Sequence, residues 1–191
     1  MYRLHGVCIK SMGPDLVLRF DPLYKNQYPT TEHYSVQLLR KGENYKLGKH
    51  NLPPFIPASQ LLEKYIGNGI KEFVEEVRKL LYAYIQRREG LKEAKKTYEN
   101  NFHDEVEADI AVSYLKFKLW TSENFPPMEV TMQYSLEKCL PDTLEMSPAG
   151  TDEETYSMSR KTLEQRLKVM RQILLNNDIF TALSQIVQKY S

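Results

Sequence analysis

The 191-residue chain lacks any run of 18 consecutive apolar residues, and its first residues do not form a secretory signal peptide. We therefore expect neither a membrane partner nor secretion. Cysteine is scarce: Cys8 and Cys139 are the two present, far apart and without a C-x-x-C spacing. This usage predicts no disulfide framework and fits a reducing compartment.

The short motifs that mark many enzymes are also missing. The sequence has no G-x-G-x-x-G or G-K-[ST] phosphate loop, no G-x-S-x-G elbow and no H-E-x-x-H zinc motif. The closest group of metal-type ligands, residues 103–105 (HDE), has no second ligand pair, which favours a solvated turn over a metal site. A reactive thiolate at Cys139 is the less favoured interpretation of that residue. We expect no catalytic, cofactor-binding or metal-binding residues.

The net charge is only +1, but it is distributed unevenly. Residues 1–100 hold 17 Lys and Arg against 11 Asp and Glu, a balance of +6, and residues 101–191 hold 9 against 14, a balance of −5. Such a split suits steering of a protein partner, or docking of the halves on each other. The basic stretch from Arg87 to Lys96 is interleaved with glutamates, so we interpret it as a solvated helix end. We expect no direct sequence-specific binding of nucleic acid.

The clearest structural signal is an apolar stripe between residues 70 and 85. Apolar side chains recur there with the 3.6-residue period of a helix, while the opposite face is charged. This pattern predicts a long helix with a buried face, capped by Asn68. We expect Phe73, Val77 and Leu81 near the centre of the stripe to be core residues and not to face a partner.

Alternating apolar and polar residues predict strands on both sides of this helix. In the first half they cover residues 2–9, 16–20 and 33–39, with a brief strand at 45–47; in the second half they cover 111–120, 128–134 and, more weakly, 143–146. We interpret residues 87–105 as a fraying helix end and a link, and 147–154 as an acidic loop. Terminal helices follow, with Ser159 or Thr162 as a candidate cap of the first and Asp178 as a cap of the second. Strands followed by helices in each half indicate an α+β fold with two units, residues 1–98 and 99–191.

The entry to the long helix, and the helix itself, carry a resemblance to a known family. The residues that carry it are the LPPFIP run at 52–57 followed by Leu61, Lys64, Tyr65, Ile70, Phe73, Leu81, Tyr82, Ala83, Tyr84 and Arg87. This stretch resembles the corresponding part of the centromere protein O family. The predicted hairpin between residues 114 and 134, and the terminal helix with Phe180 and Val187, are similar to that family too.

The resemblance implies a tandem RWD protein of the inner kinetochore, each RWD-like domain being an antiparallel strand meander packed on C-terminal helices. It implies a non-catalytic subunit in the nucleus, at the centromere and kinetochore, that serves chromosome segregation in mitosis. It also implies a heterodimer with centromere protein P and assembly with centromere proteins Q and U in the constitutive centromere-associated network. The family usually carries a coiled-coil segment ahead of its RWD domains, and we expect this chain to lack it.

Two other functional classes stay open. RWD domains share a core with ubiquitin-conjugating enzymes, but those enzymes need a His-Pro-Asn stretch ahead of a cysteine, and neither Cys8 nor Cys139 has one. The other class is an RWD adaptor that acts outside the kinetochore.

The second half offers the best candidates for a partner interface. Large aromatic groups near strand rims or chain ends supply contact area, and buried aromatics dominate interface energies. The candidates are Tyr114, Trp120, Phe180 and Tyr190.

Overall fold

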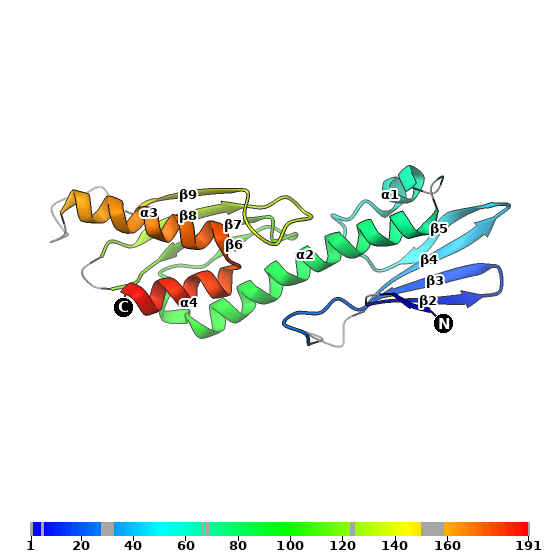
Figure 1. Ribbon diagram of the computed structural model, residues 1–191, viewed down its shortest axis with the longest axis horizontal. Helices are drawn as coiled ribbons and strands as arrows, with labels where there is room; N and C mark the ends of the chain where they lie inside the picture. The colour runs from blue at the N-terminus through cyan, green and yellow to red at the C-terminus, as the bar shows by residue number, and fades with distance from the viewer. Residues whose placement is uncertain are drawn as a thin grey trace. The chain divides into compact units, whose positions relative to one another are not determined.

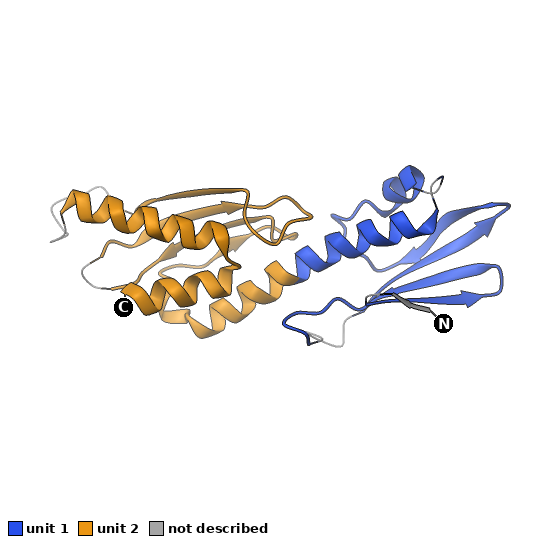
Figure 2. Cartoon of the chain, viewed as in Figure 1, with its two compact units in different colours: residues 1–85 blue, residues 86–191 orange. Residues whose placement is uncertain are grey.

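The computed structural model describes residues 2–4, 6–27, 33–65, 67, 69–122, 125–149 and 159–190. It divides the chain into two compact units, residues 1–85 and 86–191 (Figure 2). Each unit contains an antiparallel sheet and helices, which confirms the α+β class. Within the described ranges no helix has the length and apolar character needed to span a bilayer.

The first unit is built on a five-stranded antiparallel meander in the order β1-β2-β3-β4-β5 (Figure 1). Its strands are β1 (Tyr2–Leu4), β2 (Val7–Met12), β3 (Asp15–Phe20), β4 (Tyr34–Lys41) and β5 (Asn44–His50). Two of the connections are two-residue hairpin loops that begin with Gly13 (φ 66°) and Gly42 (φ 64°). Tight hairpins need a residue at positive φ in this position, which glycine adopts at little cost.

The expectation of one strand over residues 2–9 was wrong, because the chain reverses there and β1 pairs with β2. Gly6 lies between the two strands with φ 83°, a conformation that alternation of apolar residues does not reveal. Its carbonyl accepts a hydrogen bond from Asp21 N at 2.9 Å. A Cβ at this position would lie only 3.2 Å from Asp21 O, so glycine is favoured by space as well as by conformation.

Helices α1 (Ala58–Tyr65) and α2 (Ile70–Thr97) follow the first sheet. The first turns of α2 lie along one face of that sheet (Figure 1), and the expected stripe is buried: Phe73 and Val77 are 0% exposed. Leu81 is buried as well, which confirms that the stripe is core. Burying each large apolar side chain contributes roughly 1.5–3 kcal/mol. The predicted cap, Asn68, lies outside the described residues.

The interpretation of residues 87–105 as a fraying helix end was wrong, because α2 continues to Thr97. Arg87, Leu91 and Ala94 are buried at i, i+4 and i+7, so the helix carries a second buried stripe. The boundary between the two compact units falls within α2, between residues 85 and 86. The boundary expected from the sequence lay after residue 98. The position differs because residues of α2 beyond that point make their tertiary contacts with the second unit.

The second unit is a four-stranded antiparallel sheet in the order β6-β7-β8-β9, with α3 and α4 over one face (Figure 1). Its elements are a 3-10 turn (Glu99–Asn101), β6 (Glu107–Ala108), β7 (Tyr114–Leu119), β8 (Met128–Gln133), β9 (Thr143–Pro148), α3 (Arg160–Asn176) and α4 (Ile179–Tyr190). In β7 and β8 buried residues alternate with half-buried or exposed ones, as expected for a sheet covered on one face.

The caps expected for the two terminal helices are confirmed. Ser159 Oγ accepts a hydrogen bond from Thr162 N at 3.3 Å, which selects Ser159 over Thr162 as the cap of α3. The Asp178 carboxylate accepts from Thr181 N at 3.1 Å and so caps α4. The short strand β6 was not expected, and β7 begins at residue 114 instead of 111. The acidic loop is described only to residue 149, and the remainder lies outside the described residues.

Replacing Phe73 with alanine should lower the free energy of unfolding by about 3–5 kcal/mol, because it leaves a cavity under the first turn of α2. Urea denaturation of the whole chain measures this change. Lys79→Ala, on the exposed side of the same helix, is the matched control and should stay within about 0.5 kcal/mol of the parent. Equal stability of the Phe73 variant and the control would place this side chain outside the core.

Candidate interaction site

A buried arginine, Arg87 of α2, organises one end of the second unit. Its side chain is 3% exposed, and Nη1 donates hydrogen bonds to the carbonyls of Ser135 (3.1 Å), Leu136 (3.2 Å) and Lys138 (2.5 Å). Nη2 donates to the carbonyl of Ala111 at 3.1 Å. One guanidinium therefore joins two loops, residues 109–113 before β7 and residues 134–142 after β8. We call these the first and second anchored loops.

Burial shapes the ionisable groups around this arginine. Loss of solvation lowers the pKa of Arg87, while the nearby Cys139, Tyr134 and acidic side chains act in the opposite direction. Burial likewise raises the pKa of the Tyr134 hydroxyl, whose ring lies 5.6 Å from the guanidinium carbon, and of the Cys139 thiol. A raised pKa reduces the thiolate population, which argues against a reactive cysteine here.

Each anchored loop is also held by an aspartate that binds backbone amides. In the first loop, Asp109 Oδ1 accepts from Ser113 N (2.6 Å) and Tyr114 N (3.0 Å). In the second loop, Asp142 Oδ2 accepts from Ser135 N at 2.5 Å, and Lys138 pairs with the same carboxylate. These hydrogen bonds, with the Lys138 ammonium first among them, hold the pKa of Asp142 at about 2. Both loops therefore have two independent restraints.

The first anchored loop also contains a strained residue. Val112 has φ 51°, in the left-handed region that β-branched side chains rarely adopt. Its side chain is buried and its amide donates to Asp109 O at 3.0 Å. Backbone strain of this kind costs on the order of 1–3 kcal/mol and persists where surrounding contacts determine the conformation. Arg87 and Asp109 supply those contacts.

The anchored loops present apolar side chains to solvent. Ile110 is 70% exposed beside Ala111, and Leu140 is 41% exposed two residues after Lys138. Trp120, 40% exposed, lies at the other end of β7, where its indole Nε1 donates to Ser122 O at 2.8 Å. Large apolar groups held in fixed positions at the surface are typical of residues that a partner covers.

The four aromatic residues predicted for the interface differ in exposure. Trp120 is exposed, whereas Tyr114, Phe180 and Tyr190 are half-buried. The Phe180 ring lies 5.9 Å from that of Tyr98, and the Arg166 guanidinium lies 5.4 Å from the ring of Tyr190. These intramolecular contacts give the two terminal-helix aromatics a packing role within the unit, whether or not a partner reaches them.

Sequence reasoning missed the anchored loops and interpreted Arg87 as part of a solvated charge run. A local signal was present, because Arg87, Leu91 and Ala94 continue the helical period. The partners of the guanidinium, however, are backbone carbonyls 24 to 51 residues away, and any residue type supplies a carbonyl. No sequence motif encodes them.

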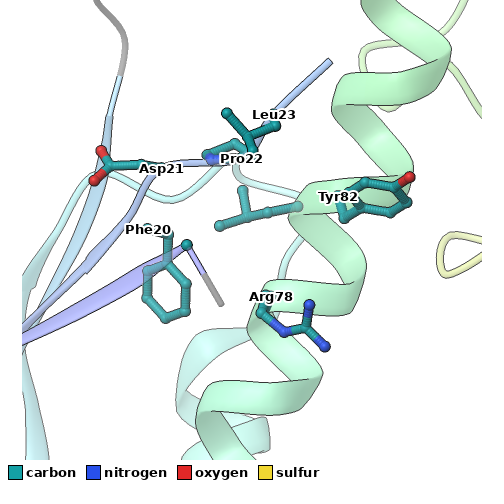
Figure 3. Close-up of a pocket in the computed structure, with 8 residues that line it drawn as sticks. Phe20, Asp21, Pro22, Leu23, Arg78 and Tyr82 are labelled. Carbon is teal, nitrogen blue, oxygen red and sulfur yellow. The ribbon is translucent and has the colours of Figure 1, made fainter. Parts of the chain in front are cut away.

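The first unit has a small apolar hollow between the end of β3 and α2. Figure 3 shows Arg78 and Tyr82 of α2 together with the segment from Phe20 to Leu23, all of which line this hollow. The cavity measures about 190 Å³, and its buried floor includes Phe20 and Leu81. Arg78 is engaged by Glu75 at 2.8 Å. Ligand pockets usually measure roughly 300–1,000 Å³, so this hollow suits a single side chain better than a substrate.

The described part of the chain contains no group of three or more His, Cys, Asp or Glu side chains with the geometry of a metal site. His103 lies against Asp104 at 3.3 Å, and Lys118 takes the other carboxylate oxygen of Asp104 at 2.6 Å. This cluster is a surface ion-pair network, which agrees with the interpretation of residues 103–105 as a solvated turn.

Comparison with known proteins identifies one family. The model of the Cenp-O kinetochore centromere component family matches residues 10–185. Centromere protein O of Gallus gallus is 24% identical over 156 residues, which cover 75% of this chain and 47% of the relative. The chain thus spans about half the length of that relative. These matches confirm the resemblance seen in the sequence.

Replacing Arg87 with methionine should lower the free energy of unfolding by at least about 3 kcal/mol, because several partly buried carbonyls lose their charged donor. Lys95→Met, exposed on the same helix, should change it by less than about 0.5 kcal/mol. Chemical denaturation measures both values. A small loss at Arg87, equal to that at Lys95, would show that the anchored loops do not depend on the guanidinium.

Proposed function

This chain belongs to the family of Cenp-O kinetochore centromere components, and on that premise we propose that it is a non-catalytic structural subunit of the inner kinetochore. Its site of action is then the centromere of nuclear chromosomes, and its role is in chromosome segregation. The described residues offer exposed apolar contact surfaces and loops whose backbone is held by hydrogen bonds, which suits a structural role.

The proposed partner is centromere protein P, in a heterodimer formed through tandem RWD-like domains at residues 1–98 and 99–191. The proposed larger assembly includes centromere proteins Q and U in the constitutive centromere-associated network. Support comes from family membership and from the order of elements, since each unit is a strand meander followed by helices. The charge difference between the halves, +6 against −5, also suits an oriented encounter with another protein.

One observation carries the proposal that the second unit makes the pairing contact: Ile110 and Leu140 are exposed on loops held by one buried arginine. Because the loop backbone is held before binding, it loses little conformational entropy when a partner covers these side chains. Trp120 extends the candidate surface toward the other end of β7. Burying such a side chain at the centre of an interface contributes more than rim charges do.

Ile110→Ser and Trp120→Ala should each weaken pairing with centromere protein P by about tenfold or more, because each removes a large exposed apolar group. Sedimentation velocity of the whole chain, alone and mixed with centromere protein P, measures the association. Tyr82→Ser is the matched control, since Tyr82 is 47% exposed, between the values for Trp120 and Ile110, but belongs to the first unit.

Two outcomes would contradict the proposal. If the parent chain does not associate with centromere protein P at micromolar concentration, that protein is not its partner. This result would favour an adaptor that acts outside the kinetochore. Equal weakening by the Tyr82 control would show that pairing is not specific to the second unit. Circular dichroism melts of each variant separate lost pairing from lost folding.

A further inference from the structure

The outer face of the first sheet is the face turned away from the stripe of α2. The register places Lys10 opposite Val17, and Leu39 opposite Lys46, with the side chains of each pair on the same side. Met12, paired with Asp15, and Lys41 also lie on this face by alternation. We call Lys10, Met12, Val17, Leu39, Lys41 and Lys46 the outer patch.

The patch combines exposed apolar groups with basic groups. Met12 is 56% and Leu39 is 38% exposed, and Val17, which pairs with Lys10 and Gln37 on the same face, is half-buried. Together with Tyr82, Met12 and Leu39 are the large hydrophobic side chains exposed in the described part of the first unit. A single exposed apolar residue needs no explanation, but two exposed apolar residues on the same sheet face as a half-buried third form a surface that a partner would dehydrate.

The positive charges of the patch are not balanced within the first unit. Among the described residues, Lys10, Lys41 and Lys46 have no acidic partner, and the ammonium of Lys46 lowers the pKa of Lys41. Asp15, the acid that pairs with Met12 on this face, accepts a hydrogen bond from Arg40 N at 2.9 Å. Glu43, in the hairpin turn, is the nearest acid to Lys41 in the sequence. Two neighbouring ammonium groups would be stabilised by an anionic group placed between them.

We propose that the outer patch binds an acidic amphipathic helix of a protein partner, whose leucine-like residues cover Met12, Val17 and Leu39 while its carboxylates pair with the lysines. Helix on sheet is a common packing arrangement, and sign complementarity selects the acidic partner. The apolar centre favours protein over nucleic acid, because a phosphate backbone offers nothing to bury against methionine and leucine. This surface belongs to the first unit and is additional to the pairing contact proposed for the second.

The probe is a synthetic fluorescent peptide of about five helical turns, with leucines along one stripe and glutamates beside it. Anisotropy titration with the whole chain should show binding that weakens as salt is added, since the exposed charges are screened. The double change Lys41→Glu with Lys46→Glu should weaken it by about tenfold or more. Leu39→Ser should weaken it as well, because the apolar contact is lost.

The matched control is Lys95→Glu with Lys96→Glu, which makes the same change in net charge on exposed residues of the second unit. This control should bind the peptide with an affinity within about twofold of the parent, because exposed charges are screened beyond roughly one Debye length from the outer patch. That result supports the proposal. Equal weakening by both double variants, no binding by the parent, or tighter binding of a short DNA duplex than of the peptide would each overturn it. Unchanged thermal melts establish that the variants are folded, and sedimentation with centromere protein P tests pairing separately.

Discussion

The arrangement of the second unit depends on one buried cation. Burying a guanidinium is costly unless its donors are satisfied, and here four backbone carbonyls from two loops accept from Nη1 and Nη2 of Arg87, whereas Nε has no hydrogen-bond partner among the described residues. Burial of the guanidinium therefore constrains both loops, since their carbonyls must remain within hydrogen-bond distance of the same side chain. Asp109 and Asp142 restrain each loop a second time from the solvent side.

This constraint connects the core of the unit with its surface. Backbone strain at Val112 is tolerated because the hydrogen bonds around it determine the backbone conformation. The same hydrogen bonds restrain the backbone of the neighbouring loop residues. Exposed apolar side chains on mobile loops bind weakly because ordering the loop is costly, whereas hydrogen bonds already restrain the backbone on either side of Ile110 and Leu140. The structural role proposed for the chain rests on this combination of restraint and exposure, together with membership of the Cenp-O family.

The elements that could be predicted from the sequence are those with a local pattern of residues, either a periodic spacing of apolar side chains or a capping side chain. The stripe through Phe73 and Val77 has the helical period, β7 and β8 alternate, and Ser159 and Asp178 are side chains suited to caps, so each was predictable. The chain reversal at Gly6 was not predicted, because the alternation of apolar and polar residues does not report a positive backbone φ angle. The role of Arg87 could not be predicted because a charged residue within a charged run is usually solvent-exposed. Its hydrogen-bond partners are backbone carbonyls, which every residue type has.

Hydrogen–deuterium exchange of the whole chain, alone and with centromere protein P, tests the central claim most directly. If the anchored loops make the pairing contact, amides in residues 109–113 and 134–142 should gain protection on binding, beyond that of the β2–β3 hairpin of the first unit. Protection confined to the first unit, or none in either loop, would contradict the claim.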